Sequence, residues 1–442
     1  MSSARNRELV ALVPVALLLS AGFAAVFAQE NDRLGDASLV YGAYFLAVCL
    51  ATHVYLRLRL ASADPYLFPL AALLTAFGLV MIYRIDADLA RDQANWFVLG
   101  LVLFALTVHF LRDYDVLERY RYTIAGAALL LLLAPRLPGI GQQVNGAYLG
   151  VKVGPLAFQP AEFAKIGIVV FLASYLREHR EVLIVGARRV LGVTLPPLKH
   201  LGPLLVVWGA SMFMLVFIRD LGSSLMFFAA FLALLYVATG RFSFVVIGIG
   251  LFLVGAWFFA STVPHVSDRI EVWLDPYQNP ATSGYQILQS IFAQADGGLF
   301  GKGFGQALIA IPGTDNALLP AAQTDTIYAL IVNEAGLFGA SGLVLAYLLF
   351  AARGFKIALL ADDGFSKLLA TGLTAVFAFQ AFVIIGGVTR VIPLTGVTLP
   401  FVSYGGSSIV ANFVLLALLL LISDRARREA TAPRGAFAGG GA

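Results

Sequence analysis

Long apolar runs, separated by short polar segments, are the main pattern along this chain. In a window of about 19 residues, such runs recur near 8–28, 38–56, 65–83, 95–111, 121–135, 160–176, 201–218, 222–239, 243–261, 326–352, 366–387 and 408–423. A stretch of this kind is typical of a helix that crosses a bilayer. The pattern therefore predicts an all-α polytopic membrane protein with about twelve transmembrane helices.

An even number of helices puts both termini on one side of the membrane. Lys and Arg identify that side, because cytoplasmic loops carry an excess of them. In this topology about twenty of the thirty Lys and Arg residues share the side of the termini. We therefore expect a multi-pass protein of the cytoplasmic (inner) membrane, with both termini in the cytoplasm.

The first apolar run has a second interpretation. The opening "MSSARNRELVALVPVALLLSAGFAAVFAQE" has a basic leader, an apolar core and small residues at Val26 and Ala28, as a cleavable signal does. The run is also long enough to span a bilayer, and cleavage at Ala28 leaves every later helix oriented as before. We interpret it as a membrane helix, with the cleaved signal as the alternative.

Composition narrows the classes of function. With 60% hydrophobic and 13% charged residues and a mean hydropathy of +0.85, the chain is not a water-soluble protein. Its net charge of +4 is spread through short loops without a basic tract, so we expect no nucleic-acid partner. The single Cys49 excludes an internal disulfide. The chain also lacks a phosphate-binding Gly-rich loop, HExxH, GxSxG, and Cys or His at metal-ligand spacing, which leaves carboxylates, basic residues and hydroxyls for chemistry.

The predicted topology gathers the irregular polar segments on the outer face. These segments are 135–162, 219–224, 262–325 and 389–408. Irregular backbone at membrane depth is tolerated only where protein or a water-filled cavity satisfies its amides. We therefore expect a polar cavity on this face.

The stretch "FVSYGGSS" is the clearest candidate for the wall of that cavity. It offers two glycines, which permit close backbone approach, and three hydroxyl groups, at Gly405, Gly406, Ser403, Tyr404 and Ser407. The alternative is a helix-capping loop with Ser407 or Ser408 as N-cap and no ligand.

Ionisable residues at the membrane boundary support a site on the same face, because each is costly unless paired or wetted. Glu162 and Lys165 lie three residues apart in "FQPAEFAKI" and can pair on one helix face, which fits a structural role. Arg219 and Asp220 lie between two apolar runs. Further ionisable residues near this face are Asp325, Glu334 and Arg390.

The long segment 262–325 is more elaborate than a channel needs. It contains two proline turns, the amphipathic stretch "YQILQSIFAQA" and the flexible turn "GGLFGKG" with Lys302. A lid of this kind favours a transferase that acts on a lipid-borne substrate.

Five ordered motifs resemble those of the SEDS family (shape, elongation, division and sporulation), whose members include FtsW and RodA. They are "FQPAEFAK", "RDLGSS", "RIEVWLDP" with "GYQILQS" and "GGLFGKGFG", "TDTIYALIVNEAGLFG", and "PLTGVTLPFVSYGGSS". The resemblance covers roughly 64–428, and the family usually has ten helices. It thus divides the chain into two extra N-terminal helices (1–60), a SEDS-like core including the 262–325 loop (61–428) and a disordered cytoplasmic tail (429–442).

The resemblance implies an inverting peptidoglycan glycosyltransferase, which polymerises lipid II on the outer face of the cytoplasmic membrane for cell elongation or division. Lipid II is an undecaprenyl-pyrophosphate-linked disaccharide peptide, and the usual partner is a class B penicillin-binding protein. The pyrophosphate leaves without a proton, so one carboxylate base and some cations suffice. No cofactor is certain, and a divalent cation (Mg or Mn) at the pyrophosphate is an open alternative.

The implied site residues follow from the motifs. The cations to place at the pyrophosphate are Lys165, Arg269, Lys302 and Arg390. The other substrate-binding candidates are Glu162, Tyr285, Gln286, Ser290 and Asp325, together with Ser403, Tyr404, Gly405, Gly406 and Ser407.

Two departures from the family pattern leave the catalytic residue open. Asn279 stands where the family has an essential aspartate, and an amide cannot accept a proton as a base. Asp275, four residues upstream, is the candidate replacement. Gly150 stands where a tryptophan is common. The alternatives are an enzyme with a relocated base, a non-catalytic scaffold for a penicillin-binding protein, or a flippase or transporter of lipid-linked precursor.

Overall fold

The computed structural model describes residues 2–31, 36–144, 147–154, 156–185, 188–190, 193–195, 209, 220–311 and 317–431. The expected helix near 201–218 lies outside the described residues except for position 209, as do Arg219 and the expected tail beyond 431.

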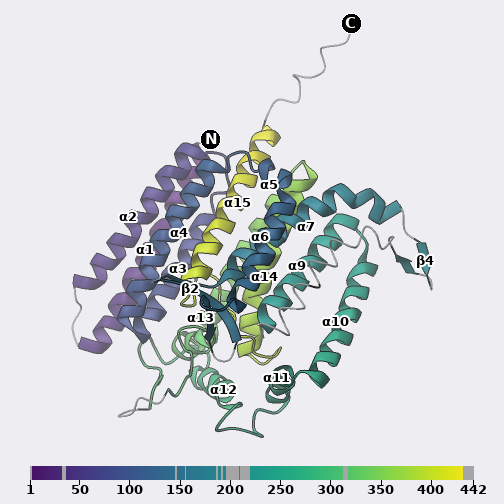
Figure 1. Cartoon of the computed structure of the whole chain (residues 1–442). Helices are drawn as coiled ribbons and strands as arrows, with labels where there is room; N and C mark the ends of the chain where they lie inside the picture. Colours follow the sequence, from purple (N-terminus) through teal and green to yellow (C-terminus); the bar gives the residue numbers. More distant parts are fainter. Residues whose placement is uncertain are drawn as a thin grey trace.

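The described chain is mainly a bundle of long helices (Figure 1). They are α1 (Ser2–Asn31), α2 (Asp36–Arg59), α3 (Leu67–Ile85), α4 (Ala87–Phe110), α6 (Arg121–Leu133), α7 (Pro160–Val185), α9 (Leu221–Thr239), α10 (Phe242–Thr262), α13 (Ile327–Leu360), α14 (Gly364–Val388) and α15 (Gly406–Thr431). Among the described residues, nine helices are long and apolar enough to cross a membrane. The all-α polytopic fold is confirmed, and the total of twelve spans stays a prediction.

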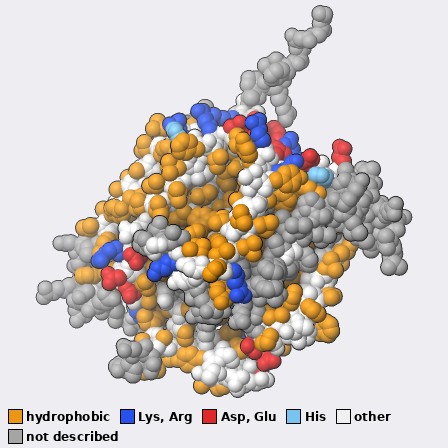
Figure 2. Space-filling model, viewed as in Figure 1, with side chains coloured by type: hydrophobic (Ala, Val, Ile, Leu, Met, Phe, Trp, Pro, Cys, Tyr) orange, Lys and Arg blue, Asp and Glu red, His pale blue; other side chains and the backbone are white. Residues whose placement is uncertain are grey.

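The bundle has two distinct ends. The start of α1 and the end of α15 lie at one end, which we call the terminal end, together with the short α5 (Asp115–Arg119) (Figure 1). At the opposite end, which we call the distal end, lie α11 (Pro264–Leu274) and α12 (Tyr285–Gly297). Hydrophobic side chains cover the flank between them (Figure 2), as expected of a surface that faces lipid.

Burial shows which helices form the centre. In the most apolar window of α15, 83% of the residues are buried, and in α14 78%, whereas in α10 only 6% are. A helix that is hydrophobic all round is buried by protein or faces lipid. We therefore place α14 and α15 in the core and α10 at the lipid-facing edge.

A small sheet replaces part of the irregular segment expected at 135–162. After the 3₁₀ turn η1 (Ala134–Arg136), the strands β1 (Gly141–Val144), β2 (Ala147–Val153) and β3 (Leu156–Phe158) pair antiparallel in the order β1-β2-β3. Gly150 pairs with Gln142 in this sheet. A second hairpin joins β4 (Arg188–Val190) and β5 (Val193–Leu195). The dipeptide "NG" between the first two strands is a hairpin signal that the hydropathy pattern does not register.

The helix expected at 326–352 is not continuous. Inside α13, Gly336 has φ 69° and ψ −179°, a conformation that favours glycine. Backbone of the preceding loop pairs with the broken turn, since the Leu337 N–H donates to the Gly298 carbonyl at 3.0 Å and the Lys302 N–H to the Asn333 carbonyl at 2.9 Å. A Cβ at position 336 would lie 2.3 Å from the Gly301 nitrogen. The loop therefore satisfies the amides that the break releases.

Charged side chains tie α1 and α15 to the start of α3 at the terminal end. Arg5 of α1 pairs with Glu8 at 2.5 Å and also donates to the Ala63 carbonyl. Beside them, Asp64 pairs with Arg427 of α15. These contacts hold the start of α3 against both α1 and α15.

Candidate functional site

The segment 389–405, which we call the re-entrant segment, runs between α14 and α15 and packs into the bundle. Close packing depends on glycine: a Cβ at Gly78 of α3 would lie 2.5 Å from the Val402 carbonyl oxygen, and one at Gly222 of α9 only 1.9 Å from Val397 Cγ2. No larger residue fits at either position without moving this segment.

Most polar groups of "FVSYGGSS" are used within the protein. The Ser403 hydroxyl accepts from Leu399 N–H at 2.9 Å and donates to the Thr324 carbonyl at 2.8 Å. The Gln93 amide of α4 donates to the Ser403 carbonyl at 3.2 Å and accepts from Gly405 N–H at 3.1 Å. These contacts fix the shape of the segment.

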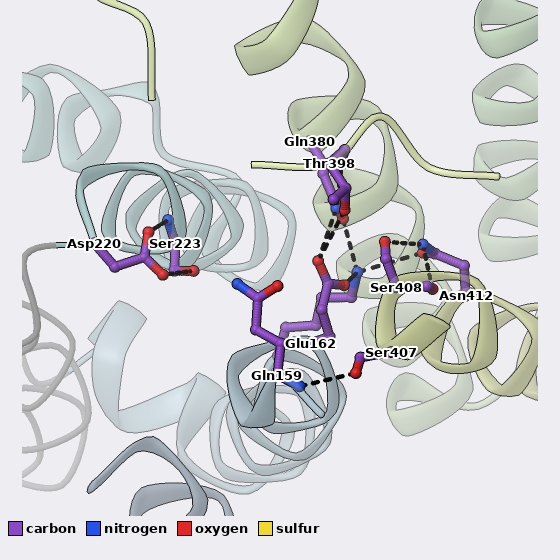
Figure 3. Close-up of polar contacts among 10 residues, drawn as sticks. Gln159, Glu162, Asp220, Ser223, Gln380, Thr398, Ser407, Ser408 and Asn412 are labelled. Atoms are coloured by element: carbon purple, nitrogen blue, oxygen red, sulfur yellow. Dashed lines mark hydrogen bonds and ion pairs between the residues drawn. The ribbon is translucent and has the colours of Figure 1, made fainter. Parts of the chain in front are cut away.

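The alternative interpretation, an N-cap at Ser407 or Ser408, is wrong, because α15 already begins at Gly406 and the Ile409 N–H donates to the Gly405 carbonyl. The Ser407 hydroxyl instead accepts from the Gln159 N–H at 2.8 Å (Figure 3). It therefore joins α15 to the start of α7.

Two further residues of this stretch lie against other elements. A Cβ at Gly406 would lie 2.3 Å from Cε2 of Trp96 on α4. The Tyr404 N–H donates to the Gln323 carbonyl at 2.8 Å. Burial raises the pKa of the Tyr404 hydroxyl, and Asp92 and Asp86 raise it further, so that hydroxyl stays protonated and available as a donor.

Glu162 and Lys165 form the expected ion pair, at 2.6 Å and with side chains 3% and 1% exposed. The ammonium also donates to the Gln380 amide oxygen at 2.7 Å and to the Asn412 amide oxygen at 3.3 Å (Figure 3). Three acceptors match the three N–H groups of a lysine. Lys165 is therefore fully used inside the bundle and is not free to bind a phosphate.

This buried network also holds the re-entrant segment. The Gln380 amide donates to Glu162 at 3.1 Å and to the Thr398 carbonyl at 2.9 Å, and the Thr398 hydroxyl lies 3.4 Å from the Glu162 carboxylate. Gln380 and Asn412 were missed in the sequence analysis, although an amide inside an apolar helix is itself a signal of function or packing.

A second set of charged residues, which we call the distal polar cluster, consists of Asp220, Arg269 and Asp325. Asp220 caps the start of α9 through Ser223, whose N–H and hydroxyl donate to its two oxygens at 2.9 and 2.6 Å (Figure 3). Arg269 of α11 donates to the carbonyl of Leu394 in the re-entrant segment at 2.8 Å.

Asp325 precedes α13 and faces the same segment, since a Cβ at Gly396 would lie 3.6 Å from its Oδ2. Burial raises the pKa of Asp325 to about 6, while the Arg269 guanidinium and the Thr324 hydroxyl oppose the increase. Burial also raises the pKa of Asp220 against the hydrogen bonds of Ser223 and the charge of Arg269. Arg269 thus acts on both carboxylates.

An apolar groove of about 1030 Å³ runs between α9, α10, α11 and α14. Its wall includes Leu221, Val266, Ile270, Trp273, Ile392 and Pro393. Leu221, Ile270 and Pro393 are the chain neighbours of Asp220, Arg269 and Leu394, so this end of the groove lies beside the distal polar cluster. Within the described chain, the buried Thr395 hydroxyl beside this cluster has no hydrogen-bond partner. The arrangement suits a ligand with an apolar tail and a polar head.

Lys302 and Arg390 were expected to bind phosphate, but in the described structure both have other partners. Lys302 pairs with Asp296, whose pKa this hydrogen bond lowers. Arg390 has φ 62°. Its guanidinium donates to the Trp273 carbonyl at 2.7 Å, and its backbone carbonyl accepts from the Trp273 indole N–H at 3.0 Å. Arg390 therefore anchors α11 to the re-entrant segment. Among the described contacts, neither side chain touches the distal polar cluster.

Asp275 and Asn279 lie on an exposed turn after α11. Asp275 accepts from the Tyr277 N–H at 3.1 Å, and the Asn279 carbonyl accepts from the Gly284 N–H at 3.0 Å. In the part of the chain that the structure describes, neither side chain contacts Arg269. The structure does not bring the two catalytic candidates into the distal polar cluster.

The candidates on α12 are mainly structural. The Tyr285 hydroxyl donates to the Ala317 carbonyl at 3.2 Å, and the buried Ser290 hydroxyl donates to the Gln286 carbonyl of its own helix at 2.7 Å. The described residues contain no group of three or more His, Cys, Asp or Glu that could hold a metal ion. A divalent cation carried by the substrate stays a prediction.

Comparison with known proteins agrees with these features. A family model of cell cycle proteins (FtsW, RodA, SpoVE) matches residues 65–428. The peptidoglycan glycosyltransferase RodA of Mycobacterium tuberculosis is 40% identical, over 97% of this chain and 93% of that protein. Stage V sporulation protein E of Bacillus subtilis is 31% identical, over 83% and 98%.

Two solved structures are similar as well. A chain of a peptidoglycan synthase complex has a TM-score of 0.66 and 27% identity, over 84% of this chain and 99% of that one. The Rod shape determining protein RodA of Thermus thermophilus has a TM-score of 0.58 and 27% identity, over 83% and 98%. The chain therefore belongs to the FtsW, RodA and SpoVE family of cell cycle proteins, the SEDS family that its motifs resemble.

Proposed function

We propose that this protein is an inverting peptidoglycan glycosyltransferase that polymerises lipid II into glycan strands at the outer face of the cytoplasmic membrane. The observation that carries the proposal is the apolar groove that lies beside the distal polar cluster. The names of the relatives, as glycosyltransferases, support the activity.

The groove and the cluster have different physical tasks. A lipid chain gains little free energy by leaving lipid for an apolar groove, because the bilayer is as apolar as the groove. The groove therefore guides the polyprenyl chain laterally and sets its position. Affinity for the head comes from charge: Arg269 presents N–H donors near the groove end, and a guanidinium matches phosphate oxygens well.

The same residues fit the chemistry of transfer. The acceptor hydroxyl attacks the anomeric carbon from the face opposite the pyrophosphate, so the configuration inverts. Negative charge grows on the pyrophosphate oxygen as the bond breaks, and Arg269 is placed to stabilise it. Fixed charges of this kind, aimed at the developing charge, are a major source of rate enhancement.

The membrane topology and partner follow the same proposal. Both ends of the described chain lie at the terminal end (Figure 1), where Arg427 and Arg5 are located, and an excess of basic residues favours the cytoplasm. A peptidoglycan synthase complex among the similar structures couples polymerization to crosslinking. We propose a class B penicillin-binding protein as the crosslinking partner, in cell elongation or division.

One observation favours a second function. Asn279 is an exposed amide, and Asp275 is an exposed turn residue, so neither forms a built catalytic centre here. A non-catalytic scaffold for the penicillin-binding protein would have the same fold. The transporter alternative has no such support, since Glu162 and Lys165 satisfy each other in a buried network.

The test is polymerisation of fluorescent lipid II by the purified protein, with the partner's transpeptidase blocked. Ala229 lines the groove, so Ala229→Trp should fill it and reduce strand formation. Ala127→Trp, on the exposed side of α6, is the matched control and should retain activity. A scaffold would give no strands from any variant, and equal activity of both Trp variants would remove the groove from the site.

A further inference from the structure

The end of α14 holds an arginine where helices usually have glycine. Arg390 has φ 62°, a left-handed conformation that is strained for a residue with a Cβ. Its N–H donates to the Gly387 carbonyl at 3.2 Å, and the Val391 N–H donates to the Gly386 carbonyl at 2.7 Å. This is the Schellman pattern, whose left-handed position is most often glycine. Strain of this kind persists only where surrounding contacts hold the residue in place.

Those contacts are made with the last turn of α11. The Arg390 guanidinium donates to the Trp273 carbonyl at 2.7 Å and to the Leu274 carbonyl, and the Trp273 indole N–H donates back to the Arg390 carbonyl at 3.0 Å. The last carbonyls of a helix lack partners within it, and a cation at this end interacts favourably with the helix dipole. Arg390 thus caps α11 from the position that ends α14. We call this reciprocal contact the Arg390–Trp273 clamp.

α11 has little apolar packing to hold it. Among its described side chains only Val266 is buried, at 4% exposure. One side of the helix borders the apolar groove through Val266, Ile270 and Trp273. A segment with few buried apolar contacts has low local stability. The position of α11 therefore depends on its polar contacts.

The clamp lies one helical turn from Arg269. Arg269 and Trp273 are four residues apart, so they share one face of α11. Their side chains donate to two backbone carbonyls of the re-entrant segment, those of Leu394 and Arg390. The helix face and the segment therefore match at two points.

We propose that Arg390 and Trp273 are positioning residues, which hold α11 and with it the Arg269 guanidinium in register for the transfer reaction. The inference rests on the proposed function, in which Arg269 stabilises the charge of the leaving pyrophosphate. Fixed charges increase the rate only when they are aimed at the developing charge, and a displacement of about 1 Å can cost about 100-fold in rate. Loss of the clamp keeps the Arg269 charge but lets α11 move.

The first test is hydrogen exchange in Arg390→Gly, measured by mass spectrometry. This change removes the clamp and also relieves the backbone strain, because glycine is the preferred residue in this conformation. The denaturant midpoint should therefore stay near that of wild type. The amides of α11 should exchange faster, and those of α14 should not. Unchanged exchange in α11 would overturn the clamp.

The matched control removes another arginine of the chain. Arg91 of α4 is exposed and pairs with the exposed Asp88 at 3.2 Å, and such a pair contributes little. Arg91→Gln should leave both the exchange of α11 and the rate of polymerisation unchanged.

The second test is the initial rate of lipid II polymerisation, with the partner's transpeptidase blocked. Arg390→Gly should slow the reaction about tenfold or more. Trp273→Phe keeps an aromatic ring at the groove but loses the indole N–H, and should slow it by a smaller factor.

An Arg269→Lys background shows whether the clamp acts through Arg269. Lysine keeps the charge but loses the fork of N–H donors, so its exact position matters less. Arg390→Gly should therefore slow Arg269→Lys by a smaller factor than it slows wild type, because residues that act through one another are not additive. A purely structural role would give equal factors in both backgrounds, and that result would overturn the action through Arg269.

The two readouts separate this inference from the proposed function. Faster exchange of α11 with an unchanged rate in Arg390→Gly would overturn the positioning role alone. No strands from wild type would overturn the proposed enzyme function and the role in transfer with it, whereas faster exchange of α11 would still support the clamp.

Discussion

The buried pair of Glu162 and Lys165 allows one prediction to be worked out in magnitude. In Lys165→Met the carboxylate of Glu162, 3% exposed, loses the cation 2.6 Å away. The amide oxygens of Gln380 and Asn412 lose their donor as well. Removal of one partner of a buried pair costs about 3–5 kcal/mol of unfolding free energy, because a buried charge is left without compensation.

The double variant Glu162→Gln with Lys165→Met removes both charges and should recover part of this loss. An unsatisfied buried polar group costs about 1–3 kcal/mol, so we expect the double variant to be destabilised by roughly that amount and the single variant by more. Lys302→Met breaks an exposed pair and should have no measurable effect on stability.

The assay can use the single cysteine of the chain. Cys49 is buried in α2, so a maleimide dye reports unfolding without an engineered label. Midpoints of denaturant unfolding in detergent would be compared across the three variants. An unfolding midpoint of Lys165→Met equal to that of wild type, or a double variant no more stable than the single one, would contradict this prediction.

The other predictions concern the distal end. Gly222→Val should destabilise the protein and abolish polymerisation, since its Cβ would lie 1.9 Å from Val397 Cγ2. The control Gly250→Val on α10, with nothing within 4 Å of the added Cβ, should leave stability and polymerisation nearly unchanged. Denaturant unfolding and strand formation would be measured for both variants. Arg269 opposes the increase in the pKa of Asp325 that burial causes, so Arg269→Met should raise this pKa further. Infrared spectroscopy of the carboxyl band against pH would measure it, and an unchanged titration midpoint would contradict the electrostatic coupling.

Hydropathy predicted the described membrane helices well. The expected span 222–239 corresponds to α9 (Leu221–Thr239), and 366–387 corresponds to α14 (Gly364–Val388). Helices of this kind must satisfy all their backbone groups internally, so their bounds follow from local sequence alone. Two features of the fold were not predicted, the sheet β1-β2-β3 and the break in α13, and both depend on backbone pairing between segments.

The first is the sheet β1-β2-β3, whose short strands carry too weak a pattern to register in a window of about 19 residues. The second is the break at Gly336, which exists because the loop around Gly301 lies against it. A glycine in a helical run is compatible with a continuous helix, and only the tertiary contact shows that here it is not.

The candidate site was predicted in part. Arg269 and Asp325 were on the list of binding residues, and the structure brings them together at Leu394 and Gly396. The sequence also suggested Lys165 as a phosphate ligand, but its three acceptors lie on α7, α14 and α15. Packing between helices far apart in sequence decides which cations find acceptors inside the protein. The pattern of charges along the chain therefore could not distinguish Lys165, which is paired in the bundle, from Arg269.

The most direct test of the proposed function is product formation from fluorescent lipid II by purified wild type and by Arg269→Met, with the partner's transpeptidase blocked. We predict a ladder of glycan strands from wild type that a muramidase digests, and loss of that ladder in Arg269→Met while lipid II remains intact. No ladder from wild type with its partner present, or an equal ladder from both proteins, would contradict it.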